Sequence, residues 1–195
     1  MDEMATESLT GRLLVATPVL ADPNFRRTVI LVVEHEAEEG TLGVVLNRPT
    51  DVPVERVLDA WSDLVTGPSV VFKGGPVAPN SALAIGLVPG DAEPLGWHAL
   101  DGAAAAMSRL GLVDLDAPPD LLAPAIHRLR VYAGYAGWAP GQLKGEIDEG
   151  AWYVVPAEPA DAFAGEPGEL WGEVLRRQGG EMAFTATFPD DPSLN

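Results

Sequence analysis

The stretch RVYAGYAGWAPGQLKGEIDEGAWYVV, residues 130–155, carries the clearest signals for local structure in this chain. Residues 126–133 alternate and then become apolar throughout, a pattern typical of a β-strand. Gly134 and Gly137 follow it, and glycine adopts backbone angles that a Cβ atom forbids. The pattern therefore predicts a strand that ends in a glycine turn.

A short helix and a second strand are predicted after this turn. Pro140 suits the first position of a helix, because its missing N–H would have no partner there. Leu143 and Ile147 lie one turn apart and give the helix one apolar face. Gly150 suits the position just past the helix end, and residues 151–155 are apolar enough for a strand. These signals define an architecture and do not identify a chemistry.

On both sides of this stretch, apolar runs bounded by turn residues predict further elements. Five runs predict strands, the second and third forming an antiparallel hairpin: residues 13–17, 28–34, 41–47, 70–72 and 82–88. Four helices or helical turns are also predicted. Apolar residues at helical spacing predict residues 54–61 and 169–177, an Asp101 cap and a Gly111 stop predict residues 101–110, and one helical turn is expected at residues 120–125, after two prolines. Since no repeat or linker interrupts the pattern, we expect one domain over residues 11–188. Residues 1–10 are expected to be a disordered lead-in and residues 189–195 a tail.

The composition excludes several classes of function. Among 195 residues, 29 acids against 12 bases give a formal charge of −17, which opposes binding to nucleic acid or to anionic membranes. The chain has no cysteine, so disulfides, thiol catalysis and thiolate metal sites are excluded. The acidic N-terminus does not resemble a signal peptide, and no apolar run approaches the roughly 20 residues that a membrane span needs. We therefore expect a cytoplasmic protein.

Sequence motifs for cofactors and catalysis are absent. No two glycines are separated by one residue, no glycine precedes a lysine, and no serine has the flanks of a nucleophile elbow. Of the three histidines, only His35 has acidic neighbours. On a strand Glu34 and Glu36 would share one face while His35 points to the other. We expect no cofactor, metal or catalytic residue, which favours a non-enzymatic protein.

Two groups of residues allow a functional and a structural interpretation. Gly74, Gly75 and Pro76 could expose backbone amides to an anion beside Lys73, although a tight exit from the preceding strand is the favoured explanation. The paired bases Arg26–Arg27 could be a solvated strand edge. The other pair, residues 176–177, suits the last turn of a helix.

The aromatic residues of the central stretch allow two interpretations. Trp138, Trp152 and Tyr135 could line a pocket, but an aromatic cluster beside glycines is more often core packing. Gln142 lies about 100° around the predicted helix from Leu143, at the border of the buried face. We expect both tryptophans to be structural and Gln142 to face a recognition groove.

Four ordered blocks of this sequence resemble the YqgE/AlgH family of bacterial proteins, some of which are named as regulators of transcription. The blocks are LVATPVLADPNFRRTVI at 14–30, EHEAEEGTLGVVLNRP at 34–49, GGPV at 74–77 and YAGYAGWAPGQLKGEIDEGAW at 132–152. The resemblance implies an α+β fold in which a branched, mixed or antiparallel sheet curls into a partial barrel flanked by short helices.

We therefore predict a cytosolic regulatory or binding protein whose partner is another protein, with no nucleic acid or membrane as partner and with the oligomeric state left open. One alternative is an enzyme or binding protein for a small molecule near residues 74–76 and Gln142. The other is a DNA-binding transcriptional regulator, which the charge disfavours. The predicted recognition surface has eight residues: Asn47, Arg48, Lys73, Gly74, Gly75, Pro76, Tyr135 and Gln142.

Overall fold

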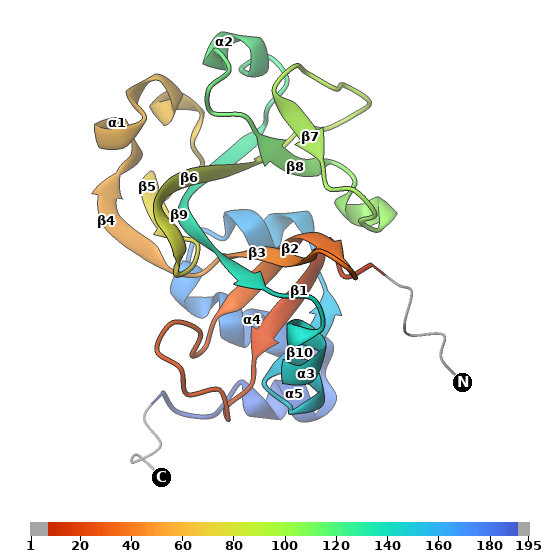
Figure 1. Ribbon diagram of the computed structural model, residues 1–195. Helices are drawn as coiled ribbons and strands as arrows, with labels where there is room; N and C mark the ends of the chain where they lie inside the picture. The colour runs from red at the N-terminus through yellow and green to blue at the C-terminus, as the bar shows by residue number, and fades with distance from the viewer. Residues whose placement is uncertain (1–7, 191–195) are drawn as a thin grey trace.

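The computed structural model describes residues 8–190, and its frame is a curled sheet of ten strands (Figure 1). The predicted lead-in and tail lie mostly outside these residues. The strands are β1 (Arg12–Ala16), β2 (Val29–Glu36), β3 (Gly40–Val45), β4 (Pro49–Pro53), β5 (Val70–Lys73), β6 (Val77–Leu87), β7 (Trp97–Ala99), β8 (Leu110–Val113), β9 (Arg128–Trp138) and β10 (Trp152–Pro156).

Strand β9 is the branch point of this sheet. The main path runs β10-β1-β2-β3-β9-β6-β8-β7, and all of its paired neighbours are antiparallel. Strand β5 pairs with β9 in parallel and with β4 in antiparallel orientation, so β4 and β5 form a side branch. The predicted α+β class, with a branched and mostly antiparallel sheet curled into a partial barrel, is confirmed.

The helices are short and flank the sheet (Figure 1). The α-helices are α1 (Val54–Val57), α2 (Pro119–Leu122), α3 (Gln142–Asp148), α4 (Leu170–Gln178) and α5 (Gly180–Thr185). The 3₁₀ helices are Asp59–Leu64, Ala105–Met107, Pro159–Phe163 and Pro167–Glu169. Within residues 8–190, none of these helices has the length and apolarity to cross a membrane.

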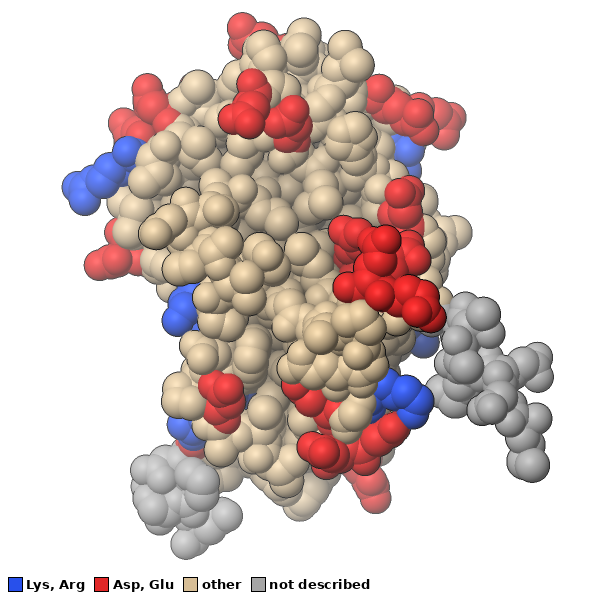
Figure 2. All heavy atoms as spheres, in the orientation of Figure 1, with Lys and Arg blue, Asp and Glu red and all other residues tan. Residues whose placement is uncertain are grey.

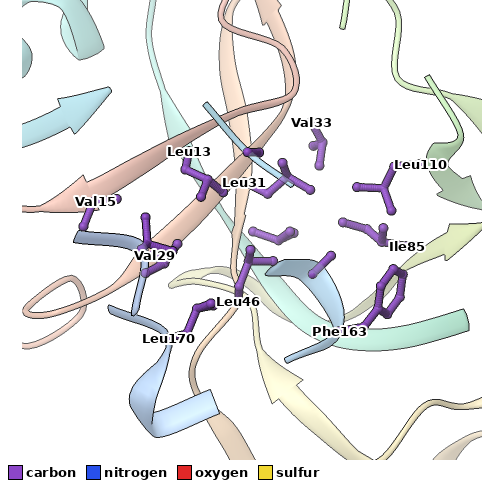
Figure 3. Packing of buried hydrophobic residues seen from close by; sticks show 14 of the residues in the cluster. Leu13, Val15, Val29, Leu31, Val33, Leu46, Ile85, Leu110, Phe163 and Leu170 are labelled. Atoms are coloured by element: carbon purple, nitrogen blue, oxygen red, sulfur yellow. The ribbon is translucent and has the colours of Figure 1, made fainter. Parts of the chain in front are cut away.

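The structure confirms the predicted buried face of helix α4. Leu170, Trp171, Val174 and Leu175 are all buried, and Gly179 ends the helix with a φ of 74°. They pack in the main core cluster with residues of β1, β2 and β3, as Figure 3 shows for Leu170. The core thus joins helix α4 to the first three strands.

The predicted glycine turn after residue 133 is wrong, because β9 continues to Trp138. Gly134 has a φ of 71°, which bends the strand without ending it. A Cβ atom at Gly134 would lie 2.6 Å from the carbonyl oxygen of Gly75 and 2.8 Å from that of Val77. The glycine therefore lets another backbone segment approach β9, a long-range requirement that local patterning does not reveal.

Two helix predictions need correction. The helix predicted at 101–110 is wrong, since only Ala105–Met107 is helical and residue 110 begins β8. Leu110 and Gly111, the predicted helix end and stop, instead pair with β6 and β7, so strand pairing outweighs the local end signals. The helix predicted at 54–61 breaks after α1 into a 3₁₀ helix, and Val57 is 55% exposed rather than buried.

Arg130 is a cation buried inside this fold. Its guanidinium donates hydrogen bonds to the carbonyl oxygens of Gly67, Ala162 and Ala164, and its Cζ lies 4.3 Å from the ring centroid of Phe72. Burial lowers the pKa of Arg130, and the nearby Tyr132 partly offsets this effect. The side chain fastens the segment after β10 onto β9.

Candidate functional site

A cleft of about 590 Å³ separates the loop that joins β1 to β2 from the C-terminal segment. Arg26 and Arg27 supply positive charge to its wall. Trp171, Phe184 and Phe188 are among the residues that supply apolar surface. The cleft therefore combines two guanidinium groups with aromatic side chains, a composition common at binding interfaces.

Asn47 fixes the backbone of the arginine loop at its end. The Oδ1 atom of Asn47 accepts a hydrogen bond from the backbone amide of Val29 at 3.0 Å, and its Nδ2 donates to the carbonyl of Arg27 at 2.8 Å. Both groups lie where the loop enters β2. The side chain thus satisfies one donor and one acceptor that the sheet leaves open.

Arg48 fixes the same loop nearer its middle. Its Nη1 donates to the carbonyl of Pro23 at 2.8 Å, and its Nη2 donates to the carbonyl of Arg26 at 3.0 Å. Partial burial lowers the pKa of Arg48, while Asp22 acts in the opposite direction. Two predicted recognition residues, Asn47 and Arg48, therefore hold the loop that presents the two arginines.

Arg27 is held in an unusual conformation. Its φ is 53°, a left-handed value that costs roughly 1–2 kcal/mol for a residue with a Cβ. The guanidinium carbon lies 4.2 Å from the ring centroid of Trp171, and the Nε atom lies 2.8 Å from Oδ1 of Asp190. The guanidinium also donates to the carbonyl of Phe188. Backbone strain of this kind is concentrated at functional sites.

Arg26 differs from its neighbour. Its side chain is exposed at the cleft, and its guanidinium has no hydrogen-bond or ionic partner among residues 8–190. Within residues 8–190, the cleft therefore presents one cation with partners and one without.

The opposite side of the arginine loop rests on the central aromatic stretch. Phe25 packs against Trp138 and Trp152, with ring centroids 6.3 and 5.7 Å away. Both indole nitrogens donate to Oε2 of Glu146, at 2.9 and 2.8 Å, and the side chain of Gln142 donates to Oε1 at 3.0 Å. Helix α3 thus supports the cleft loop through two tryptophans and a phenylalanine.

The glycine corner at the end of β5 adjoins Arg48, whose backbone carbonyl accepts a hydrogen bond from the amide of Lys73 at 2.8 Å. A Cβ atom at Gly74 would lie 2.3 Å from the carbonyl oxygen of Gly134, and one at Gly75 would lie 2.1 Å from the carbonyl carbon of Tyr135. The amide of Gly74 donates to Ala133 and is unavailable to an anion. Close backbone packing accounts for both glycines.

The remaining predicted recognition residues occupy two other places. Lys73 and Pro76 are exposed on either side of the glycine corner. Tyr135 lines a shallower depression of about 410 Å³ together with Glu34 and Glu39. Gln142 is exposed on α3, where its Oε1 also accepts a hydrogen bond from the amide of residue 139 at 3.0 Å. Of the eight residues, Tyr135 lines this depression and none lines the Arg26–Arg27 cleft.

The part of the chain that the structure describes holds no group of three histidines, aspartates or glutamates arranged to bind a metal ion. His35 forms a 2.7 Å hydrogen bond with the hydroxyl of Thr41.

Sequence patterns did not identify the C-terminal side of the cleft. The only available signal was the arginine pair after a turn, which a solvated strand edge also explains.

Fold and cleft together define an α+β protein with a branched sheet and one basic, aromatic cleft. The chain belongs to the AlgH-like family, whose sequence profile matches residues 13–183, as the resemblance predicted. It is 60% identical over 192 residues to a UPF0301 protein of Streptomyces coelicolor, with 96% of each chain covered. It is 47% identical over 185 residues to one of Mycobacterium leprae, covering 95% of this chain and 90% of the relative.

Two solved structures share the fold. A crystal structure of a protein from Corynebacterium diphtheriae superposes with a TM-score of 0.84 and 36% identity, covering 92% of each chain. The solution structure of the AlgH protein from Pseudomonas aeruginosa superposes with a TM-score of 0.67 and 26% identity, covering 98% of this chain and 100% of that one.

Proposed function

We propose that this chain is a non-enzymatic binding protein that takes a segment of a partner protein into the Arg26–Arg27 cleft. The observation that carries the proposal is the exposed guanidinium of Arg26, which has no partner among the described residues 8–190, beside an aromatic surface. A ligand with a carboxylate and an apolar group would satisfy both features. Hydrogen bonds between charged groups are roughly twice as strong as neutral ones.

The rigidity of the loop supports this proposal. Asn47 and Arg48 fix the loop backbone from one side, and Phe25 anchors it on the tryptophan pair from the other. A site that is already ordered loses less conformational entropy when it binds a partner. The arrangement therefore favours recognition by a preformed surface.

The distribution of charge favours a short acidic segment over nucleic acid. Figure 2 shows acidic side chains spread over the visible face, with the basic side chains isolated from one another. The charge of −17 repels a long polyanion along its whole length. A short segment in the cleft meets mainly the local arginines, because screening limits charge effects to about 8 Å at physiological salt. The proposal includes a cytoplasmic location, which the cysteine-free composition supports.

Site-specific photocrosslinking in the native bacterium tests the proposal. A photoreactive phenylalanine analogue at Phe184, 68% exposed in the cleft, should capture a defined partner protein. The same analogue at Leu121, 50% exposed on α2, should not. Arg26→Ala should abolish the capture, while Arg56→Ala, which alters an exposed arginine on α1, should leave it unchanged. Identical products at both positions, or no effect of Arg26→Ala, would refute the proposal.

A further inference from the structure

The chain's own C-terminal segment already satisfies one of the two cleft arginines. The carboxylate of Asp190 pairs with Nε of Arg27 at 2.8 Å, and the backbone carbonyl of Phe188 accepts a hydrogen bond from the same guanidinium. Pro189 lies between them and also lines the cleft. Residues 188–190 form the C-terminal side of the cleft and therefore show which chemistry the opposite wall of Arg27 and Trp171 accepts: an aromatic residue, a proline and an acid in sequence.

The aromatic part of this segment is only loosely anchored. Phe184 and Phe188 meet edge to face, with ring centroids 5.6 Å apart. They remain 68% and 40% exposed, respectively. Contiguous exposed apolar surface of this kind often marks a site of interaction. The segment thus leaves apolar surface available at the cleft.

The ionic part of the contact is also weak enough to be exchanged. The side chain of Asp190 is 80% exposed and that of Arg27 is 27% exposed. Exposed ion pairs contribute little net stability, because water and salt screen them and the side chains lose entropy. A competing acid that also filled the apolar surface would make better contacts than Asp190 does.

We infer that the cleft recognises an aromatic–proline–aspartate segment of a partner protein, and that residues 188–190 compete with this segment from within the chain. The inference rests on the proposed function and specifies its ligand. Arg27 exchanges Asp190 for the partner's carboxylate, and Arg26 contributes a second cation. A tethered competitor acts at an effective concentration on the order of millimolar. The partner's segment binds only the molecules whose cleft is open. Its apparent affinity is therefore the affinity for the open cleft multiplied by the fraction of molecules with an open cleft.

Fluorescence anisotropy with a labelled peptide tests this inference on the full chain. The probe is the amidated peptide FTATFPD, the sequence of residues 184–190, whose single carboxylate is the terminal aspartate side chain. The chain variant Asp190→Asn weakens the internal contact and should bind this probe about threefold more tightly than the unmodified chain, the scale expected for an exposed ion pair. Asp51→Asn, which changes an exposed acid on β4, is the matched control and should bind as the unmodified chain does.

A second probe, FTATFPN, removes the peptide carboxylate without touching the protein fold. It should bind the Asp190→Asn chain about tenfold more weakly than FTATFPD. Equal binding of both probes, or no gain from Asp190→Asn over Asp51→Asn, would overturn the inference. Self-association of the Asp190→Asn chain in sedimentation would also overturn it, since the occupant would then be a second copy. Failure of the peptides with continued crosslinking at Phe184 would remove this ligand class and leave the proposed function standing.

Discussion

The indole rings of Trp138 and Trp152 meet edge to face with centroids 6.0 Å apart, and both donate to the same carboxylate oxygen of Glu146. Trp138 ends β9, Trp152 begins β10, and Glu146 lies on the helix between them. One half-buried acid therefore ties together three consecutive elements. Because Phe25 packs on the same rings, this acid also stabilises the loop that carries the cleft arginines.

Glu146→Ala should destabilise the protein by about 2 kcal/mol, because two buried indole donors lose a charged acceptor. Glu146→Gln keeps an acceptor oxygen and should cost about half as much. The free energy of unfolding in urea measures both effects. Glu149→Ala, which changes an exposed acid at the end of the same helix, is the control and should have little effect. Equal losses of unfolding free energy in Glu146→Ala and Glu149→Ala would contradict the role assigned to Glu146.

Trp138→Ala should destabilise by about 3–5 kcal/mol, since it empties an aromatic site in the core. Gln142→Ala should change stability by less than about 1 kcal/mol, because its side chain is exposed. Urea denaturation of the two variants distinguishes a structural residue from a surface residue. If Gln142→Ala unfolded as readily as Trp138→Ala, the glutamine would be holding the end of β9 in place through its contacts with residue 139 and Glu146.

The sequence predicts elements well where local signals and tertiary packing agree. Helix α4 combines four buried apolar residues at helical spacing with a terminal glycine, and the β2–β3 hairpin has two β-branched runs around a charged turn. The helix predicted at residues 101–110 is wrong because its start and stop signals are local. The pairing of β8 with β6 joins residues far apart in the chain. The turn predicted at Gly134 is wrong for the same reason, because the close neighbours of this glycine come from residues 75–79.

The candidate site was only half predictable. Asn47 ends a predicted strand and Arg48 follows it, and both belong to a block that resembles the family pattern. The other wall of the cleft comes from Trp171, Phe184 and Phe188, which lie more than a hundred residues away. No spacing rule relates those aromatics to the arginine pair, so only the folded chain brings them together.

Gly134→Ala should destabilise by more than about 2 kcal/mol. A Cβ atom there meets two carbonyl oxygens below 3 Å, and the φ of 71° disfavours any residue with a Cβ. Gly165→Ala is the matched control, since it meets no atom within 4 Å. Thermal unfolding of the two variants provides the measurement. Similar melting temperatures would show that the sheet relaxes around position 134.

The full chain should bind a DNA duplex no more tightly than about 10 µM at physiological salt, which is the weak range of non-specific binding. The charge of −17 opposes approach to phosphates, and the cleft provides only two arginines. A mobility-shift titration across several salt concentrations measures the affinity. Submicromolar binding that Arg26→Ala with Arg27→Ala abolishes would instead support a DNA-binding regulator.

Tyr132 makes stability depend on pH in the alkaline range. Its side chain is fully buried, its hydroxyl lies 3.3 Å from the carbonyl of Ala162, and burial raises the pKa of Tyr132 far above that of a free phenol, although Arg130 partly opposes the shift. The unfolded chain therefore loses this proton near pH 10, while the folded chain keeps it. The stabilising effect is complete below pH 10 and is lost as the pH rises toward the folded pKa.

Each unit of pH above about 10 should therefore lower the free energy of unfolding by up to about 1.4 kcal/mol through this one residue. Tyr132→Phe removes the titrating hydroxyl and should flatten that decline, at the cost of one hydrogen bond to Ala162. Urea midpoints measured from pH 8 to about pH 11 give the slopes. Tyr153→Phe, which removes a half-buried phenol, should leave the decline in place. If Tyr132→Phe kept the full slope, the alkaline loss would have to come from other groups.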